Sequence, residues 1–587
     1  MNYNLNDAIK NSATGKLGMG RFKRFIPLLT GEKRLMGLVL IAIAVNAGLD
    51  LLAPAIIGHV IDAYIKTGKY QGVILFSGIL LAIYAVSSVA SYVQTRVMGG
   101  VGQRVLFKLR NVIFTKLLSL PIAFFNQNQT GDLISRINND TDKLNQFFAQ
   151  ALIQFTRNVF VVLGAGVAVL VINVRLGSVA LVPALFLFLI TRFITVWVKK
   201  NNAINLSAGG GLSAEVQEAL NNFKVIIAFN RQDYFRDRFS IANMKNYGAA
   251  LRAGFSNNLF TPIYDLAGNV ALLAVFAYGL YLITQNKLTI GFLISYLIYV
   301  SRFYDPLRQM ASIWATFQVA LAAWDRIIAI LAMESNLPTI TDIASTGNQS
   351  VMEFKNVEFK YPDGKSVLHK INFVLEAGKT YAFVGPTGGG KTTTASLMAR
   401  LYDPTAGTVY LCGRDIRAFD AETLTKEVGF ILQEPFLFSG TVRENLIYGH
   451  SLLAGKTSGQ LLNVLKDADL SKLLGRFPNG LETPVSVSGE SISLGQKQLI
   501  AFMRAVLRKP KLLILDEATA NVDTVTEQLL DEILSHLPKE TTRVVIAHRL
   551  NTIENADEIF FVNGGEITKA GSMEHAVEML LKGKRAS

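Results

Sequence analysis

The alternation of apolar and polar positions divides the chain into an apolar first part and a mixed second part. Six segments of the first part are long enough to cross a bilayer, which requires about 20 mostly apolar residues. We place these spans at residues 35–57, 73–97, 151–172, 178–198, 259–283 and 290–311. One such segment could be the buried helix of a soluble protein, but six in series predict an all-α, six-helix transmembrane domain.

The connections after the second and fourth spans are unusually long. Residues 98–150 keep a helical apolar pattern, and residues 199–258 show no clear strand signals. We therefore expect spans two to five to continue as helices outside the membrane. Each helical pair should end in a short turn, one near residues 121–131 and one near residues 213–223. These turns are the expected contact points with the domain that follows.

From residue 351 onward the chain has an ordinary α/β pattern. The preceding residues 335–350 are polar, contain Pro338 and a cluster of glycine, serine and threonine, and show no helical stripe. That composition is typical of a linker. We therefore expect a multidomain chain with a transmembrane domain at residues 1–334, a linker at 335–350 and an α/β domain at 351–587.

The α/β domain opens with a glycine-rich motif. Residues 385–392 read Gly-Pro-Thr-Gly-Gly-Gly-Lys-Thr and follow an apolar run at 381–384 that is typical of a strand. They fit the phosphate-binding loop G-x-x-x-x-G-K-[ST], in which backbone N–H groups turn toward an anion. The lysine would reach the β- and γ-phosphates, and the threonine hydroxyl would hold Mg²⁺. We predict that ATP binds Gly385, Pro386, Thr387, Gly388, Gly389, Gly390, Lys391, Thr392 and Thr393.

A second motif supplies two carboxylates. Residues 511–517 form an apolar run that ends in Asp516 and Glu517. Asp516 would accept the Mg²⁺ shell, and Glu517 is positioned to act as the general base on an attacking water. Two acids after a strand could also form a simple edge turn, but the phosphate loop upstream favours the catalytic interpretation.

Composition and charge narrow the class of protein. A mean hydropathy of +0.32 is too high for a soluble ATPase of 587 residues. Basic residues crowd the segment before the first span and the connections after the second and fourth, whereas the alternate connections hold only Lys66, Lys69, Arg175 and Lys287. The positive-inside rule then puts both termini in the cytoplasm. We expect an integral protein of a bacterial cytoplasmic (inner) membrane, with the nucleotide-binding domain in the cytoplasm and no nucleic acid as partner.

Several shorter motifs carry a resemblance to a known family. In chain order they are Tyr361, Gln433, the pentapeptide Ile492-Ser493-Leu494-Gly495-Gln496, the tetrapeptide Ala520-Asn521-Val522-Asp523, and His548. With the phosphate loop and the two carboxylates, they make residues 20–580 similar to an ATP-binding-cassette (ABC) exporter half-transporter of the multidrug or lipid exporter type. The resemblance also covers Thr130-Gly131-Asp132, Ser135-Arg136 and Asn139-Asp140 in the first part of the chain.

The resemblance implies a role for each matched residue. Tyr361 would stack on adenine, Gln433 would sense Mg²⁺ and contact the membrane domain, and His548 would contact the γ-phosphate. Ser493, Gly495 and Gln496 would bind ATP held by a second cassette, and Asp523 lies in the loop after the catalytic glutamate. Glu517, His548 and Gln433 are thus the expected catalytic residues, and Thr392, Gln433 and Asp516 the expected metal ligands.

The function implied by the resemblance is export or flipping of an amphiphile, such as a drug, lipid or peptide. ATP would join two cassettes, and hydrolysis would release them, which drives the membrane helices between inward-facing and outward-facing states. The alternatives that the motifs leave open are an ATP-gated regulator or channel and an importer built on the exporter fold.

The signature departs from the family pattern. It reads Ile-Ser-Leu-Gly-Gln where Leu-Ser-Gly-Gly-Gln is usual, and Val487 replaces a glutamate upstream. Glu517 and the phosphate loop match in full. In heterodimeric exporters, one subunit has the full set of catalytic residues together with an altered signature. This chain has the same combination, which favours a heterodimer with a second ABC half-transporter over a homodimer.

Two aspartates lie inside predicted spans. Asp50 and Asp265 are costly to place in a bilayer, so they are candidates for function. One hypothesis is that they line the translocation cavity and favour cationic or zwitterionic amphiphiles. The alternative is that they make hydrogen bonds between helices.

Overall fold

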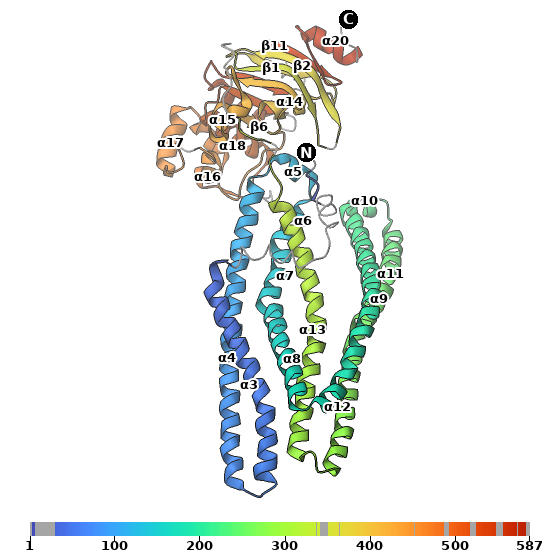
Figure 1. Cartoon of the computed structure of the whole chain (residues 1–587). Coiled ribbons are helices and arrows are strands. Elements are labelled where there is room, and N and C mark those ends of the chain that lie inside the picture. Colours follow the sequence, from blue (N-terminus) through green and yellow to red (C-terminus); the bar gives the residue numbers. More distant parts are fainter. Residues whose placement is uncertain are drawn as a thin grey trace. The chain divides into compact units, whose positions relative to one another are not determined.

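The computed structural model describes residues 3–5, 30–335, 337–340, 350–362, 364–450, 452–486, 492–516, 524–546, 556–571 and 573–582. It divides into two compact units (Figure 1). The helical unit takes in residues 9–117 and 131–332, and the α/β unit takes in residues 1–8, 118–130 and 333–587. Each unit is described by itself below.

All six predicted spans are helical. They lie in α3 (Lys33–Val60), α4 (Tyr70–Leu118), α8 (Leu152–Ile172), α9 (Val174–Asn221), α12 (Phe260–Thr284) and α13 (Ile290–Leu331). Five helical stretches of the described chain are long and apolar enough to cross a membrane: Lys33–Ile65, Tyr70–Leu118, Thr130–Ile172, Val174–Asn221 and Gln232–Thr284. The sixth span, at the start of α13, contains three charged residues where each of the others contains one. It is therefore the most polar of the six.

The spans continue as long helices beyond membrane length, as the sequence predicted. α4 and α9 have 49 and 48 residues. The third span extends backward through α6 (Thr130–Ser135), η4 (Arg136–Asp140), α7 (Thr141–Gln146) and η5 (Phe147–Ala151), and the fifth through α11 (Gln232–Asn258). α9 and α11 pack side by side along this extension (Figure 1).

The position predicted for the second turn was wrong. α9 runs through residues 213–221, and the chain turns only after Asn222, through the short helix α10 (Phe223–Ala228) and Asn230 at φ +50°. The triple glycine at 209–211 does not end the helix, because the following residues 212–221 are mostly good helix formers. Asn222 closes it by donating from its amide to the Glu218 carbonyl.

Tyrosines of α13 connect it to three other helices. The hydroxyl of Tyr296 donates to the Val169 carbonyl, that of Tyr299 to Leu51, and that of Tyr304 to Ala180, at 2.6–2.7 Å. Each ring is buried, so the hydroxyl needs a partner, and a helix carbonyl supplies it. α13 is thus the helix around which α3, α8 and α9 are arranged.

The α/β unit contains two main sheets. Four antiparallel strands have the order β2 (Ser366–Leu375), β1 (Met352–Lys360), β4 (Ala406–Leu411), β5 (Arg414–Asp415). Six strands have the order β12 (Glu566–Lys569), β11 (Glu558–Asn563), β3 (Thr380–Val384), β10 (Thr542–Ile546), β9 (Leu512–Asp516), β6 (Val428–Ile431), and all pairs except β11–β12 are parallel. A short pair, β7 (Gly440–Thr441) and β8 (Pro484–Val485), lies apart. Every residue of β9 is buried, as expected of a central parallel strand.

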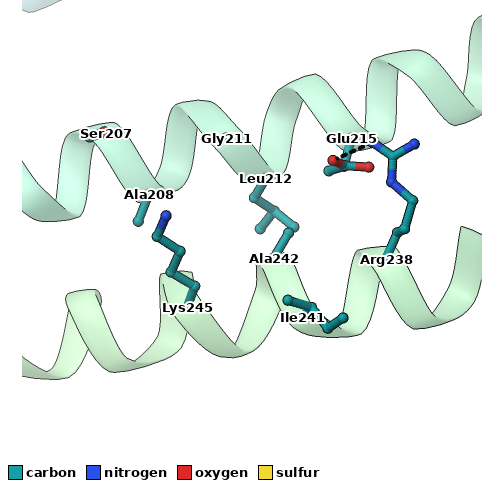
Figure 2. Close-up of a pocket in the computed structure, with 9 residues that line it drawn as sticks. All are labelled: Ser207, Ala208, Gly211, Leu212, Glu215, Arg238, Ile241, Ala242 and Lys245. Carbon is teal, nitrogen blue, oxygen red and sulfur yellow. Dashed lines mark hydrogen bonds and ion pairs between the residues drawn. The ribbon is translucent and has the colours of Figure 1, made fainter.

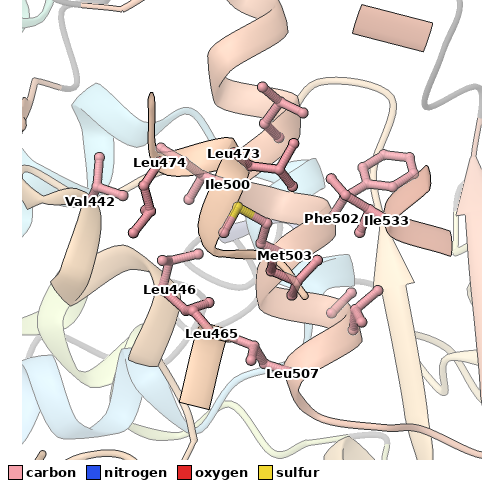
Figure 3. Packing of buried hydrophobic residues seen from close by; sticks show 14 of the residues in the cluster. Val442, Leu446, Leu465, Leu473, Leu474, Ile500, Phe502, Met503, Leu507 and Ile533 are labelled. Atoms are coloured by element: carbon pink, nitrogen blue, oxygen red, sulfur yellow. The ribbon is translucent and has the colours of Figure 1, made fainter. Parts of the chain in front are cut away.

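A helical layer packs beside these sheets around its own apolar core (Figure 3). It comprises α16 (Val442–Ile447), α17 (Ser458–Asp467), η7 (Ser471–Arg476), η8 (Gly480–Glu482), α18 (Leu494–Leu507) and α19 (Thr524–Ser535). Figure 3 shows Met503 and Phe502 of α18 packed among leucines of these helices. The remaining helices are α14 (Lys391–Met398), η6 (Ile416–Ala418), α15 (Ala421–Glu427) and α20 (Met573–Lys582). The fold class predicted from the sequence, helical membrane domain followed by α/β domain, is confirmed.

The first predicted turn belongs to the α/β unit by its contacts. It carries α5 (Ile122–Gln127), whose Phe124 is fully buried. An N-terminal segment holds it there: the amide of Tyr3 donates to Gln127 Oε1 at 2.8 Å, and Asn128 Nδ2 donates to the Tyr3 carbonyl at 2.9 Å. Tyr3 and Leu5 are both fully buried.

Candidate nucleotide-binding site

The phosphate loop connects β3 to α14, the strand–loop–helix order that the motif requires. Gly385, Gly388 and Gly390 have positive φ. A Cβ at Gly385 would lie 2.0 Å from the Val562 carbonyl oxygen of β11, and one at Gly390 would lie 2.8 Å from Leu368. Only glycine fits these positions, because a larger residue would push the loop off the strands that support it. The loop ends at Gly390, the N-cap of α14, so the positive end of that helix faces the loop.

Lys391 and Thr392 begin α14 and reach different sides of the loop. The Lys391 ammonium is buried and donates to the carbonyls of Gly385 and Pro386 at 2.8 and 3.1 Å. The Thr392 hydroxyl lies 3.4 Å from Asp516 Oδ1. The structure therefore brings together two motifs that are 124 residues apart in the chain, as the sequence analysis expected.

The oxygen atoms at this point suit a hard divalent cation. Mg²⁺ prefers hydroxyl, carboxylate and phosphate oxygens, and it is commonly bound through one or two protein groups plus substrate phosphates. Thr392 and the buried Asp516 are such a pair. Within the described residues there is no cluster of three or more His, Cys, Asp or Glu side chains that could hold a metal alone. The donor set thus fits a cation that is completed by a nucleotide.

The other motif residues follow the carboxyl ends of neighbouring parallel strands. Asp516 ends β9, Gln433 lies two residues after β6, and the loop follows β3. Ligands of open α/β sheets bind at this edge. Gln433 is exposed. Glu517, Asp523 with its tetrapeptide 520–523, His548 and Val487 lie outside the described residues.

Tyr361 lies at the end of the β1–β2 hairpin and contacts the start of α14. Its hydroxyl is 3.0 Å from Thr393 Oγ1, and its ring packs edge-on against Phe359 and Tyr402. The aromatic predicted to stack on adenine is therefore next to the phosphate loop. The Tyr402 hydroxyl in turn accepts a hydrogen bond of 2.9 Å from Asn126 of α5.

Sequence reasoning missed Tyr402 and Asn126. They link α5 to the aromatic cluster beside the phosphate loop. Neither residue lies in a motif, and their meeting depends on a contact across 276 residues. The only signal was that the turn at 121–131 was expected to contact the nucleotide domain.

The signature residues form the start of α18. Ser493 is its N-cap: its hydroxyl accepts from the Gln496 amide at 3.2 Å, and Gln496 Oε1 accepts from the Ser493 amide at 2.8 Å, which makes a capping box. A Cβ at Gly495 would lie 3.0 Å from Thr526 Oγ1. The helix N-terminus is thus held in a defined orientation, with its positive end available to an anion.

The two departures in the signature differ in their environment. Ile492 is 6% exposed and belongs to the core of Figure 3, so it replaces a leucine by a residue of equal volume. Leu494 is 41% exposed at the first position of α18. The unusual surface of the signature is therefore the Leu494 side chain alone.

Outside the nucleotide site, the motifs of the first part brace α13. Arg136 is 2% exposed and pairs with Asp132 at 2.8 Å. Asp140 accepts two hydrogen bonds of 2.6 Å from Arg326 of α13 and one from Lys143. Burial raises the pKa of Asp140, but the bonds from Arg326 and Lys143 outweigh it, and the pKa lies below its ordinary value. These residues therefore tie the extension of the third span to α13.

A second brace lies between α9 and α11. Arg238 of α11 binds Glu215 at 2.7 Å (Figure 2). It also binds Glu218 at 3.1 Å, and these bonds raise its pKa. Beside it, small residues such as Ala208, Gly211 and Ala242 line an open groove of about 320 Å³. The pair holds the two long helices together near α10, whose Phe223 and Ile227 are 56% and 51% exposed. α10 thus presents an apolar surface at the tip of a rigid hairpin.

Comparison with known proteins agrees with this geometry. Residues 36–307 match the model of the ABC transporter transmembrane region, and residues 368–520 match the ABC transporter model. An uncharacterized ABC transporter ATP-binding protein, YfiC of Bacillus subtilis, is 32% identical over 575 residues, which is 97% of this chain and 94% of that protein. The chain belongs to the ABC transporter family.

Other relatives have names that state a substrate. A fatty acid ABC transporter ATP-binding/permease protein of Mycobacterium bovis is 32% identical over 84% of this chain and 77% of its own length. An ATP-dependent lipid A-core flippase of Syntrophus aciditrophicus is 31% identical over 84% of this chain and 82% of its own length. This ABC transporter is therefore an integral membrane protein with an ATP-hydrolysing domain.

Proposed function

We propose that this ABC transporter uses ATP to export or flip an amphiphilic molecule across a bacterial cytoplasmic membrane. The observation that carries the proposal is the phosphate loop with Asp516 at the carboxyl edge of a parallel sheet, in a chain that also has membrane-length helices. Relatives that are named for fatty acid transport and lipid A-core flipping support an amphiphile as the cargo.

Each residue of the site has a proposed role in binding or hydrolysing ATP. The backbone N–H groups of residues 385–390 and the N-terminus of α14 would bind the phosphates, with Lys391 on the β- and γ-phosphates. Tyr361 would stack on adenine. Glu517 would take a proton from the attacking water, and His548 would contact the γ-phosphate. Asp523 and Gln433 would line the same site, as the family resemblance implies.

We also propose that the site binds Mg²⁺. Thr392, Asp516 and Gln433 would hold it, and the cation would neutralise charge on the β- and γ-phosphates during transfer. The oxygen atoms of Thr392 and Asp516 support this assignment, since they lie 3.4 Å apart beside the loop.

The transporter is proposed to work as a dimer with a second ABC half-transporter. Ser493, Gly495 and Gln496 would complete the ATP site of the partner, and the exposed apolar surface of α10 would dock on a nucleotide-binding domain. Leu494 supports a heterodimer, because its side chain stands at the surface where a partner's ATP would approach. Dimer formation would then bias the membrane helices toward one of two states.

We retain the domain boundaries at residues 334 and 350, with the nucleotide-binding domain in the cytoplasm.

The decisive experiment separates nucleotide binding from turnover. Glu517→Gln in the complex purified from its native membrane should retain ATP binding and lose hydrolysis by about 10²–10⁴-fold, the usual scale for a general base. Lys391→Ala should lose binding itself. Transport of a fluorescent lipid in proteoliposomes should stop in both variants. Wild-type hydrolysis in Glu517→Gln would exclude Glu517 as the base, and ATP-independent lipid movement would exclude the pump.

A further inference from the structure

The six spans carry more positive than negative charge. They contain five arginines and three aspartates, and no lysine, glutamate or histidine. Charged groups at membrane depth are costly, so they are retained for a pairing or a ligand. A charged side chain that pairs with an opposite charge is explained by that pairing. A charged side chain that stays unpaired is a candidate for binding a ligand.

The first aspartate is neutralised by an arginine. Asp50 of α3 is buried and accepts a hydrogen bond of 2.7 Å from Arg157 of α8. The Asp50 side chain is 10% exposed, whereas that of Arg157 is 39% exposed. Of this pair, the guanidinium is therefore the group that a ligand can reach.

The other two aspartates share one arginine. Asp265 of α12 lies 3.4 Å from Arg308 of α13, and Asp305 lies 4.0 Å from it. All three aspartates of the spans thus face an arginine. This pairing contradicts the use of Asp50 as a free acceptor for a cationic substrate, and it weakens the same use of Asp265.

Three arginines of the spans face no carboxylate within the described residues, namely Arg96, Arg192 and Arg302. Arg96 and Arg192 are exposed, whereas Arg302 of α13 is half-buried and makes no hydrogen bond or ion pair within the described residues. α3 and α13 run antiparallel, with Gly58 beside Gly291, Pro54 beside Ser295 and Leu51 beside Tyr299. The next turn of α13, which carries Arg302, therefore lies at the level of Asn46 and Ala47, one turn from Asp50.

The Arg157 guanidinium reaches α3 near this level, because it binds Asp50. Arg302 and Gln309 are seven residues apart, hence on one face of the helix. Gln309 Oε1 accepts from Nδ2 of Asn158, the neighbour of Arg157 in α8. The Arg157 guanidinium on Asp50 and the turn of α13 that carries Arg302 are thus about one helical turn apart along α3, and they define one polar layer between α3, α8 and α13.

We infer that this layer binds the anionic head group, carboxylate or phosphate, of the transported amphiphile. Arginine pairs with such groups through two parallel N–H···O bonds, which an ammonium head group cannot accept. The inference rests on the proposed export function and assigns its substrate class. Arg302 contributes the half-buried arginine that faces no carboxylate, and Arg157 contributes the more exposed group of an existing ion pair.

The test compares amphiphiles that differ only in the head group. The complex in nanodiscs is given lysophosphatidic acid, lysophosphatidylcholine, hexadecanoate or hexadecyltrimethylammonium, each below its micellar concentration, and stimulation of ATP hydrolysis is measured. The two anions should stimulate at about tenfold lower concentration than the zwitterion and the cation. A response to only one anion tells whether the layer prefers phosphate or carboxylate.

Three variants make the assignment specific. Arg302→Gln should raise the half-stimulating concentration of the anions about tenfold, a change of about 1.4 kcal/mol, with the response to lysophosphatidylcholine unchanged. Arg302→Lys should restore much of the anion response, which a purely structural role would not predict. Arg192→Gln, which removes an exposed arginine of another span, is the matched control and should behave as wild type.

A variant that removes a negative charge from the spans is the complementary test. Asp265→Asn leaves Arg308 with only the longer contact to Asp305 and should strengthen the anion response, whereas a cation site would lose its response in this variant. Equal stimulation by all four head groups, or equal effects of Arg302→Gln and Arg192→Gln, would overturn the inference while export stands. If hydrolysis continues but no lipid analogue moves in proteoliposomes, the export function itself fails.

Discussion

Tyr361 connects the nucleotide loop to the rest of the α/β unit through contacts of two kinds. Its ring packs against Phe359 and Tyr402, and its hydroxyl lies 3.0 Å from Thr393 Oγ1. Tyr361→Ala removes both contacts and the surface on which adenine would stack. We expect ATP binding to weaken by about 1–3 kcal/mol, the range measured for stacking of a base on an aromatic residue.

The control for that prediction is Tyr361→Phe, which keeps the ring and loses only the hydrogen bond to Thr393. A neutral hydrogen bond contributes about 0.5–1.5 kcal/mol, so the phenylalanine variant should bind ATP nearly as well as wild type. Titration with a fluorescent ATP analogue measures both variants. Equal loss in the two would mean that the hydroxyl, not the ring, supports the nucleotide.

Residue identity alone predicted the phosphate loop and Asp516, because a short motif contains nearly all the geometry it needs. It could not predict which departure in the signature matters. Ile492 and Leu494 look equally unusual in the sequence, yet one fills the core and the other stands at the surface. Burial depends on the whole helical layer, so only the structure separates them. For the same reason the Asp50–Arg157 pair, which joins residues 107 positions apart, was outside the reach of the sequence.

At the scale of elements, the extension of the third span is held to α13 by one charged pair. Asp140 and Arg326 are joined by two bonds of 2.6 Å, and the Asp140 side chain is 5% exposed. We expect Asp140→Asn to lower the free energy of unfolding of the helical unit by about 1–3 kcal/mol, because hydrogen bonds to a charged group are exchanged for weaker neutral ones.

The pair should also give the unit a defined response to acid. The folded-state pKa of Asp140 lies below the ordinary value of about 3.9, so the unfolded chain takes up the proton first as the pH falls. The stabilisation is therefore complete at neutral pH and is lost below about pH 4. In thermal unfolding from pH 7 to 3, the difference between wild type and Asp140→Asn should narrow as the pH falls below about 4. A constant gap between the two would show that the carboxylate charge is not what stabilises this contact.

Hydrophobic periodicity predicted the positions of the spans but not the position of the second turn. Span positions followed from apolar length: four of the six lie within one helix, and the third and fifth begin one residue before α8 and α12. The second turn did not follow, because residues 213–221 have helical propensity and the stop comes from the Asn222 amide binding back to Glu218. A side-chain cap of that kind leaves no trace in hydrophobic periodicity.

At the scale of the whole molecule, one chain supplies half of each proposed ATP site. The phosphate loop and Asp516 form one half, and the N-terminus of α18 is proposed to form the other half on the ATP of a second cassette. The heterodimer predicts that a tagged copy pulls one different ABC half-transporter from its native membrane in a one-to-one ratio. Native mass spectrometry of that complex measures it. In heterodimeric exporters of this pattern the partner has a weakened catalytic glutamate and an intact signature, as the family resemblance implies. In such a complex Glu517→Gln would stop nearly all hydrolysis, because the partner's signature completes the single competent site.

A homodimer would give a different pair of results. The complex would then contain two copies of this chain, and both ATP sites would have to hydrolyse ATP with an exposed Leu494 side chain in the signature. Under that arrangement Leu494→Gly should raise turnover at both sites, since the usual glycine opens the approach to Ser493. In the heterodimer the same substitution affects only the partner's nucleotide, whose hydrolysis the partner's own glutamate limits. The response of turnover to Leu494→Gly therefore reports the symmetry of the complex independently of its mass.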